Sequence, residues 1–338
     1  MNKKKSILSL MRPTGKLHLG HYLGVLTNWI KLQNDVNFDC FYGIADWHAL
    51  TTKFDETDSL KQNTVEILTD WLASGIDPDK STIYLQSLIP ETAKLHVYLS
   101  MVTPINWAER DPTLKDMVKI MKEKGSGEDS FSYGLIGYPI LMSADILTFN
   151  AEYVPVGIDQ VAHIEITRDI ARRFNNIYKT DLLIEPKPKL TEIPLLKGLD
   201  GNKMGKSFHN DIKISDTKEE TSRKIMTAIT DRSRIRRNDP GHPSDCEVIF
   251  PYWKIFGNEE EVKETEINCK NGIIGCAECK KCLANKLNGI MEPVREKRKH
   301  YEENPNELKE IIFEGSKKAR IKAREVLNLI EEKIMIYR

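Results

Sequence analysis

The chain has 338 residues, more than one hydrophobic core usually supports, so we expect two domains. Its 50 basic and 50 acidic side chains balance, which excludes a general attraction to nucleic acid and leaves local basic patches for RNA contacts. No apolar run approaches the ~20 residues of a membrane span, and the apolar stretch after the basic N-terminus is too short for a signal peptide. We therefore expect a cytoplasmic protein whose six cysteines are reduced or metal-bound.

A strand, a turn and a helix start follow one another at the N-terminus. The apolar run 7–11 predicts the strand, and residues 12–15 form a turn that leads into a helix opening at His18. This arrangement directs free backbone N–H groups at phosphate, and His18 and His21 would add side-chain donors. Gly20 has no side chain and would let an adenine or ribose ring lie against the backbone. The alternative for the histidine pair is a helix-capping role.

Alternating strand and helix patterns continue over about two hundred residues and predict a Rossmann-like parallel α/β sheet. We expect strands at 38–45 and 81–86. A helix is expected from about Asp58 to a glycine cap at Gly75.

The pattern becomes helical over 91–149, which indicates an insertion between two halves of the sheet. Later in the chain strands become scarce and charged amphipathic helices dominate. We therefore expect a sheet domain over 1–213 and an α-helical domain over 214–338.

Two lysines stand close together past the middle of the chain. The sequence 198–202 predicts a flexible, turn-rich loop that carries Lys203 and Lys206. Two ammonium groups there suit a reaction that moves negative charge onto pyrophosphate, since phosphoryl chemistry depends mostly on positioning and charge stabilisation. A solvated lysine turn is the ordinary alternative. Together with the histidine pair, however, the lysines indicate two clamps on one nucleoside triphosphate.

Met142 and Asp145 are three residues apart on a predicted helix and therefore share a face. An indole ring offers one N–H donor and an otherwise flat apolar surface. A buried carboxylate beside a thioether would satisfy that donor, and leaving such a group unpaired costs ~1–3 kcal/mol. The alternative is that Asp145 caps or solvates its helix.

Five of the six cysteines cluster in the C-terminal part, at Cys246, Cys269, Cys276, Cys279 and Cys282. Clustered thiols in a reducing compartment indicate a metal or iron–sulfur site rather than scattered buried thiols. Four thiolates suit Zn²⁺ or a [4Fe–4S] cluster equally well. The first four are the candidate ligands and Cys282 is a spare. Their distance in sequence from the phosphate motifs favours a structural or RNA-positioning role.

In these motifs the chain resembles the class I aminoacyl-tRNA synthetases and, among them, the bacterial-type tryptophanyl-tRNA synthetases. The likeness covers nearly the whole chain, through segments 9–15, 45–50, 138–147 and 154–160 to the lysine loop and the C-terminal helices. It implies activation of L-tryptophan by ATP with Mg²⁺, then transfer to the 3′ end of tRNA(Trp). It also implies a homodimer that pairs through 91–149, a C-terminal anticodon-binding domain and, from a subset of the tryptophanyl enzymes, a [4Fe–4S] cluster.

The resemblance also assigns roles to single residues. Catalysis would fall to His18, His21, Lys203 and Lys206. ATP would contact Arg12, Pro13, Thr14, Gly20, His21, Gly157, Ile158, Asp159, Ile193, Lys203, Met204, Gly205, Lys206 and Ser207. Tryptophan would contact Leu8, His48, Tyr138, Met142, Asp145, Val154, Val156 and Gln160. Two positions depart from the family: Ile158 replaces a frequent glutamate, and Gly205 replaces the usual serine.

Three alternatives stay open. A tyrosyl enzyme shares the architecture, although we identify no second hydroxyl partner for a phenol. Nucleotidyltransferases that make dinucleotide cofactors share the His-x-Gly-His turn but lack the lysine loop and the cysteines. A non-catalytic iron–sulfur RNA-binding protein would share the fold, and the intact histidines and lysines argue against it. Basic residues gather near 223–224, 232–237, 295–299 and 317–324. A solvated helix face explains most such runs, and in a helical domain of a tRNA enzyme some of these residues would contact tRNA phosphates.

Overall fold

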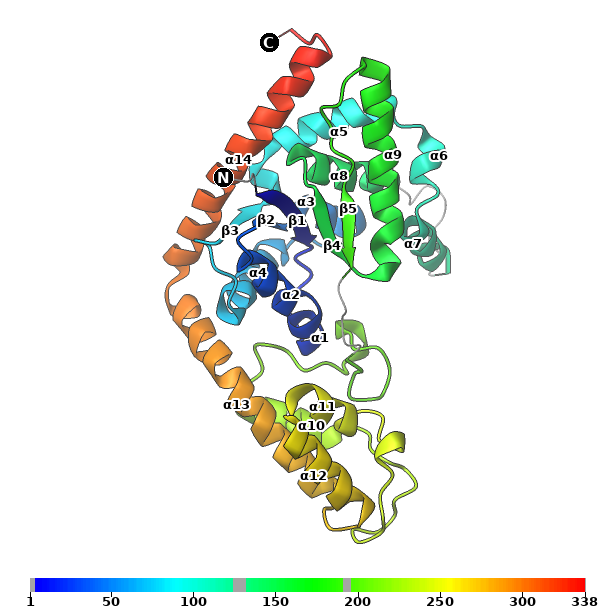
Figure 1. Cartoon of the computed structure of the whole chain (residues 1–338), viewed down its shortest axis with the longest axis vertical. Helices are drawn as coiled ribbons and strands as arrows, with labels where there is room; N and C mark the ends of the chain where they lie inside the picture. Colours follow the sequence, from blue (N-terminus) through cyan, green and yellow to red (C-terminus); the bar gives the residue numbers. More distant parts are fainter. Residues whose placement is uncertain (1–3, 124–131, 191–195, 338) are drawn as a thin grey trace.

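The computed structural model describes residues 4–123, 132–190 and 196–337. Its centre is one parallel sheet of five strands in the order β3-β2-β1-β4-β5 (Figure 1). The strands are β1 (Lys5–Met11), β2 (Phe38–Ile44), β3 (Ser81–Leu85), β4 (Tyr153–Val156) and β5 (Lys187–Leu190). The expected Rossmann-like sheet is confirmed. The strand order reverses between β1 and β4, the point where ligands bind in open parallel sheets.

Helices connect the strands and cover the sheet. They are α1 (Leu19–His21), α2 (Thr27–Gln33), α3 (Asp46–Lys53), α4 (Leu60–Ser74), α5 (Pro90–Val102), α6 (Ile105–Ala108), α7 (Pro112–Glu123), α8 (Tyr133–Thr148) and α9 (Val161–Tyr178). A π-helical turn, Tyr22–Leu26, joins α1 to α2. The helix expected to end at Gly75 is α4, and Gly75 has the left-handed φ of +111° that a glycine cap allows. Helices α5 to α8 make up the helical stretch expected over 91–149.

Aromatic packing fixes α2 and α4 against the sheet. The ring of Trp29 in α2 stacks on Tyr42 of β2, with 4.3 Å between centroids. Trp71 of α4 meets Trp29 edge-on at 4.9 Å. The Tyr42 hydroxyl donates to the backbone carbonyl of Trp29 at 2.9 Å. The helical segment that begins at the histidine pair is therefore held rigidly against β2.

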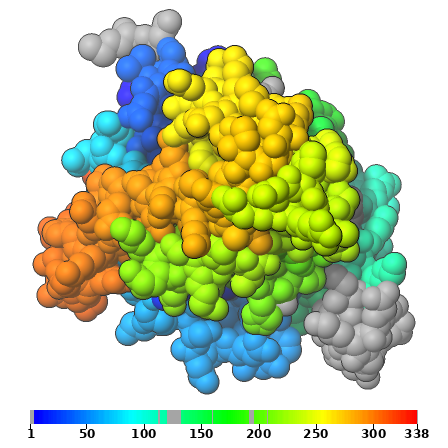
Figure 2. All heavy atoms as spheres, turned by 90° about the horizontal axis from the view of Figure 1, so that it is seen from below, coloured from blue at the N-terminus to red at the C-terminus, as the bar shows by residue number. Residues whose placement is uncertain are grey.

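The C-terminal part is helical: α10 (Lys218–Thr227), α11 (Ile249–Phe256), α12 (Glu259–Lys270), α13 (Cys276–Glu303) and α14 (Pro305–Lys333). Helices α13 and α14 run along one side of the molecule, and α10 to α12 gather beside α13 (Figure 1). Seen from below, residues of this region, green through orange, cover most of the face (Figure 2). Among the described residues, no helix has both the length and the apolar character to cross a membrane.

Helix α14 returns to the sheet instead of packing with α10 to α12. It lies on the edge strand β3, where the backbone N–H of Leu85 donates to Ser316 Oγ at 3.1 Å. Its far end is tied to α5 by Lys94, whose Nζ lies 2.6 Å from Glu331 Oε1. The helical region expected over 214–338 is therefore not separate from the sheet, because its last helix packs on β3 and α5. A domain boundary after residue 213 stays a prediction.

Candidate active site

A cavity of about 780 Å³ opens at the carboxyl ends of β1 and β4, where the strand order reverses. Its wall is built from β1, the helix start after it, α3, α8, β4 and the beginning of α9. The predicted site residues that line it are Leu8, Arg12, His21, His48, Tyr138, Met142, Asp145, Val154, Val156, Gly157, Gln160 and Lys203. Residues predicted to contact a nucleotide and residues predicted to contact an amino acid therefore share one crevice.

The two predicted histidines cap the start of α1. The backbone N–H of Gly20 donates to Nδ1 of His18 at 3.1 Å, and the N–H of His18 donates to Nδ1 of His21 at 3.3 Å. Because both Nδ1 atoms accept, each neutral ring carries its proton on Nε2 and retains one donor. Burial lowers the pKa of His18 to about 4 and that of His21 to about 3. Capping and donation from a neutral ring are therefore compatible.

The lysine segment returns to the N-terminal turn. Nζ of Lys206 donates to the carbonyl of Gly15 at 2.8 Å and to that of Thr14 at 3.3 Å. Lys203 lines the cavity. A Cβ built on Gly20 would lie 3.8 Å from Sδ of Met204. The two segments singled out in the sequence are thus in contact, and burial lowers the pKa of the Lys206 ammonium group.

Backbone hydrogen bonds hold these segments together. The N–H of Leu19 donates to the carbonyl of Ile212 at 2.9 Å, and the N–H of Ile214 donates to the carbonyl of Leu17 at 2.9 Å. The N–H of Leu17 donates in turn to Asp70 Oδ2 at 2.9 Å. The chain after the lysine loop therefore pairs with the histidine motif.

Asp145 is buried at the amino-acid end of the cavity and is held by two neighbours. Gln86 Nε2 lies 2.8 and 2.9 Å from its two oxygens, and His48 Nε2 lies 2.9 Å from Oδ2. The amide of Gln86 is oriented because its Oε1 accepts from the backbone N–H of Trp47 at 3.1 Å. Oδ1 of Asp145 keeps acceptor capacity for a ligand N–H.

Tyr138 forms a fixed wall of the same end. Its hydroxyl donates to Oδ1 of the fully buried Asp111 at 2.6 Å, and Asp111 Oδ2 lies 3.2 Å from Nδ1 of His163. The Tyr138 ring stands nearly perpendicular to His48, with 6.4 Å between centroids. The tyrosine hydroxyl is engaged behind the wall, so its ring is the part that faces a ligand.

The remaining predicted ATP residues lie outside this wall. His18, Pro13, Thr14, Gly20, Met204, Gly205 and Lys206 lie on the two contacting segments. Ile158 is 78% exposed, so this departure from the family costs no packing. The backbone of Gly205 is extended, with φ −167°, and a Cβ would meet only the exposed Phe208 ring at 3.1 Å. The side chains of Asp159 and Ser207 and the whole of Ile193 lie outside the described part of the chain.

The four candidate cysteine ligands line a second, small cavity between α11, α12 and the start of α13. They are Cys246, Cys269, Cys276 and Cys279. Burial raises the pKa of Cys279 to about 12. Cys282 is exposed and does not line this cavity. The structure brings the four candidates together at one cavity, and their role as metal ligands stays a prediction.

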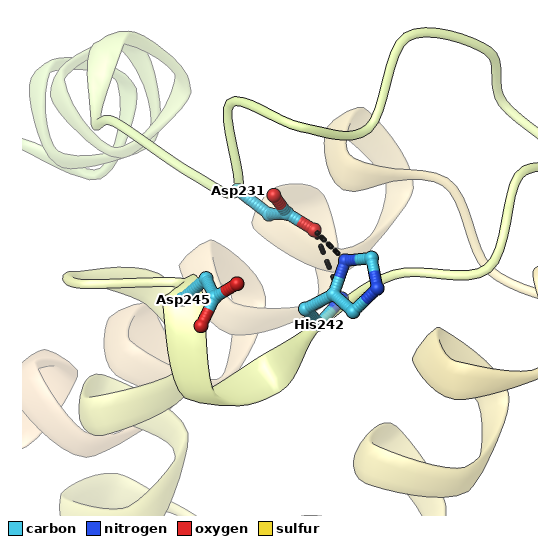
Figure 3. A group of neighbouring side chains, drawn as sticks. All are labelled: Asp231, His242 and Asp245. Atoms are coloured by element: carbon cyan, nitrogen blue, oxygen red, sulfur yellow. Dashed lines mark hydrogen bonds and ion pairs between the residues drawn. The ribbon is translucent and has the colours of Figure 1, made fainter.

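Asp231, His242 and Asp245 lie beside this cavity, with potential metal-ligand atoms within 4.8 Å of one another (Figure 3). The hydrogen bonds of Asp231 explain this grouping without a metal ion. Asp231 Oδ2 accepts from the backbone N–H of His242 at 2.9 Å and lies 3.0 Å from its Nδ1. Asp231 Oδ1 accepts from the N–H of Ser233 at 2.8 Å. Burial opposes ionisation, yet these hydrogen bonds hold the pKa of Asp231 below its usual range. Asp231 therefore stabilises the loop beside the cysteines.

Comparison with known proteins agrees with this geometry. The model of the family described as "tRNA synthetases class I (W and Y)" matches residues 1–292. The chain belongs to this family. It is similar to the tryptophan–tRNA ligase of Aquifex aeolicus, with 41% identity over 96% of this chain and 98% of that protein. The tryptophan–tRNA ligase of Thermotoga maritima is 44% identical over 93% of this chain and 94% of that protein.

A solved structure gives the same result. The tryptophanyl-tRNA synthetase of Campylobacter jejuni, complexed with ADP and tryptophan, superposes with a TM-score of 0.89. It is 36% identical and covers 98% of this chain and 100% of its own. This chain is therefore an aminoacyl-tRNA synthetase, and its fold matches that of the solved structure over 98% of this chain.

Sequence reasoning missed three buried polar residues of this synthetase. Gln86 orients Asp145, Asp111 anchors Tyr138, and Asn210 binds the lysine loop. Each is a lone polar residue whose partners are distant in sequence, so no spacing pattern indicated it. The one available signal was chemical: Gln86 is the last residue of the strand predicted over 81–86, and such strand ends meet at the ligand edge of a parallel sheet.

Proposed function

We propose that this synthetase activates L-tryptophan with ATP to tryptophanyl-adenylate and transfers it to the 3′ end of tRNA(Trp). The observation that carries the proposal is one crevice with two chemically distinct ends. One end has the neutral His21 and the Lys203 ammonium group, and the other has the oriented carboxylate of Asp145. We infer a cytoplasmic location, where tRNA and ATP are available to this reaction.

The arrangement suits adenylate formation because the reaction needs orientation more than bond-making groups. The tryptophan carboxylate attacks the α-phosphate of ATP, and pyrophosphate leaves with Mg²⁺. His18 and His21 donate hydrogen bonds through Nε2 to phosphate oxygens, and Lys203 and Lys206 stabilise the charge that develops on the bridging oxygen and the pyrophosphate. Lys206 exchanges its backbone acceptors, Gly15 and Thr14, for these oxygens.

Asp145 selects the amino acid. Its Oδ1 accepts from the indole N–H, while Met142, Val154 and Val156 contact the ring faces. A ligand without that N–H leaves a buried carboxylate without its partner, which costs about 1–3 kcal/mol. Gln160 faces the ammonium group of the substrate.

ATP–pyrophosphate exchange with tryptophan and with tyrosine tests this function. We expect exchange with tryptophan alone. Asp145→Asn removes the charge but keeps the shape, and it should raise the KM for tryptophan about tenfold to a hundredfold while the KM for ATP stays within about twofold. Exchange with tyrosine, or an unchanged KM for tryptophan in this variant, contradicts the assignment.

We propose further that Cys246, Cys269, Cys276 and Cys279 hold a [4Fe–4S] cluster. Four thiolates on one Zn²⁺ at about 2.3 Å lie about 3.8 Å from one another. Within the described residues, no three of these sulfurs lie within 4.8 Å of one another, a spread that favours the larger group. The cluster would tie α11, α12 and α13 together and supply no chemistry to the aminoacylation.

Anaerobic purification tests the cysteine site. A brown protein with four irons and four labile sulfides per chain supports the cluster, whereas stoichiometric zinc contradicts it. Cys279→Ser should abolish the metal, and Cys282→Ser serves as the matched control that retains it.

We also infer that two copies pair through α5, α6 and α8, where large apolar side chains stay exposed. These include Val97 at 49%, Met101 at 77%, Ile105 at 65% and Tyr133 at 69% exposure. Light scattering should give twice the chain mass, and Met101→Glu should shift it toward the mass of one chain. A monomeric parent protein contradicts this pairing.

Some of the basic residues considered for tRNA are already engaged. Arg295 donates to Asn288 Oδ1 at 2.7 Å and to the Asp216 carbonyl at 2.9 Å, and Arg298 is buried. Phosphate contacts therefore fall to exposed basic side chains elsewhere on α10 to α14, and tRNA affinity should decline with salt.

A further inference from the structure

The lysine loop has an organiser that takes no part in the proposed chemistry. Asn210, only 4% exposed, follows the loop that carries Lys203 and Lys206. Its Oδ1 accepts from the backbone N–H of Gly205 at 2.9 Å. Its Nδ2 donates to the backbone carbonyl of Lys203 at 3.1 Å. One amide side chain thus holds the backbone on both sides of Met204, between the two lysines.

Other contacts fix the direction of this amide. Nδ2 also donates to Asp200 Oδ1 at 2.8 Å, and the backbone carbonyl of Asn210 accepts from the N–H of Leu199 at 2.9 Å. A carboxylate only accepts and a backbone N–H only donates, so the amide fits in one orientation. Gly198 provides the space, because a Cβ there would lie 2.2 Å from Nδ2 of Asn210.

We propose that Asn210 is a positioning residue that sets where Lys203 and Lys206 stand relative to the histidine motif. It holds the carbonyl of the first lysine and the N–H that immediately precedes the second. Only a neutral amide donates to one and accepts from the other. The inference rests on the proposed role of the two lysines in stabilising the departing pyrophosphate.

The proposal predicts a specific kinetic signature. Misplacing a group that stabilises the transition state by about 1 Å costs on the order of a hundredfold in rate. The tryptophan end of the cavity is built from β4, α3 and α8, whereas the hydrogen bonds of Asn210 to other described residues go to residues 199–205. A displaced lysine loop should therefore lower kcat and leave tryptophan binding unchanged.

Asn210→Asp tests this with a residue of the same shape. It keeps the acceptor for Gly205 but turns a carboxylate toward the Lys203 carbonyl and the Asp200 carboxylate. We expect kcat for tryptophan-dependent ATP–pyrophosphate exchange to fall about tenfold to a hundredfold, with the KM for tryptophan within about twofold. Asn176→Asp makes the same change at an exposed position of α9 and should leave both parameters unchanged.

Two further variants separate positioning from folding. Gly198→Ala displaces Asn210 sterically without changing its chemistry, and it should reproduce the loss of kcat. If Asn210→Asp does not fold, the kcat of Gly198→Ala alone tests the positioning role. The double variant Asp200→Asn with Asn210→Asp exchanges the amide and the carboxylate, so that the amide at position 200 can donate to the carboxylate at position 210. It should recover the melting temperature but not kcat, because the bond to the Lys203 carbonyl stays absent.

Lys206→Ala distinguishes failure of this inference from failure of the proposed function. If Lys206→Ala retains full exchange, the role of the lysines is wrong and the inference falls with it. If Lys206→Ala loses exchange while Asn210→Asp and Gly198→Ala keep wild-type kcat, the positioning role alone is wrong.

Discussion

At the scale of single residues, the histidine pair links folding to chemistry. His18 and His21 each accept a backbone N–H through Nδ1, and each acceptance requires a neutral ring. Protonation would abolish both caps and place two cations 3.9 Å apart between ring centroids. The same neutrality leaves one Nε2 donor on each ring for phosphate. These residues are thus neutral donors, and the positive charge of the site comes from the lysines and Arg12.

This assignment predicts how stability depends on pH. The folded pKa values, about 4 and about 3, lie below the ordinary 6.5, so the unfolded chain binds more protons in acid. The free energy of unfolding should decrease as pH falls from about 6.5 to about 3, and the contribution of the two neutral rings should be complete above pH 6.5. Replacing both rings by asparagine, which also caps helices, should flatten this slope. Urea unfolding at pH 7, 6 and 5 measures it; equal slopes in parent and variant contradict the assignment.

The role of a residue could be predicted from sequence where the residues that act together are close in the chain. The capping histidines and the lysine pair are local patterns, so their meeting in one site could be expected from sequence. Gln86 and Asn210 act through partners that only the fold brings near. Each looks like any buried or loop polar residue until the sheet and the loop are in place.

At the scale of elements, local rules identified β2 and α4 well, because a buried apolar run and a glycine cap are short-range signals. The docking of α14 on β3 had no such signal. It depends on Gly315, where a Cβ would lie 1.8 Å from the carbonyl oxygen of Ile83. A helical glycine in a charged sequence does not reveal that backbone approaches backbone there.

Gly315→Ala should therefore force α14 away from the sheet edge. Ser316 would lose its bond with the N–H of Leu85, and we expect overpacking to destabilise the protein by about 1–3 kcal/mol. The matched control is Gly289→Ala in α13, where a Cβ meets nothing within 4 Å. That change should stabilise by about 0.5–1 kcal/mol through helix propensity. Chemical denaturation measures both, and a neutral Gly315→Ala rules out the close contact.

At the scale of the whole molecule, α13 connects the helical part to the active site through buried charges. The Arg298 guanidinium contacts Asp70 and Glu66 of α4, and its Nε lies 3.0 Å from Glu302. Asp70 also accepts the backbone N–H of Leu17, which directly precedes the histidine motif. One carboxylate thus joins the helix that carries Cys276 and Cys279 to the helix start that would bind ATP.

Arg298→Met should expose how much the molecule depends on this link. The arginine side chain is 5% exposed, so its loss leaves the buried Asp70 and the half-buried Glu66 without their cation, at a cost of about 3–5 kcal/mol. Adding Asp70→Asn removes one stranded charge and should recover part of that loss. Glu302→Gln changes the partner that is 55% exposed and should cost less than about 1 kcal/mol. The KM for ATP should rise in Arg298→Met, because Asp70 is then no longer held where it binds Leu17. An unchanged KM for ATP in a destabilised variant would mean that the link serves folding alone.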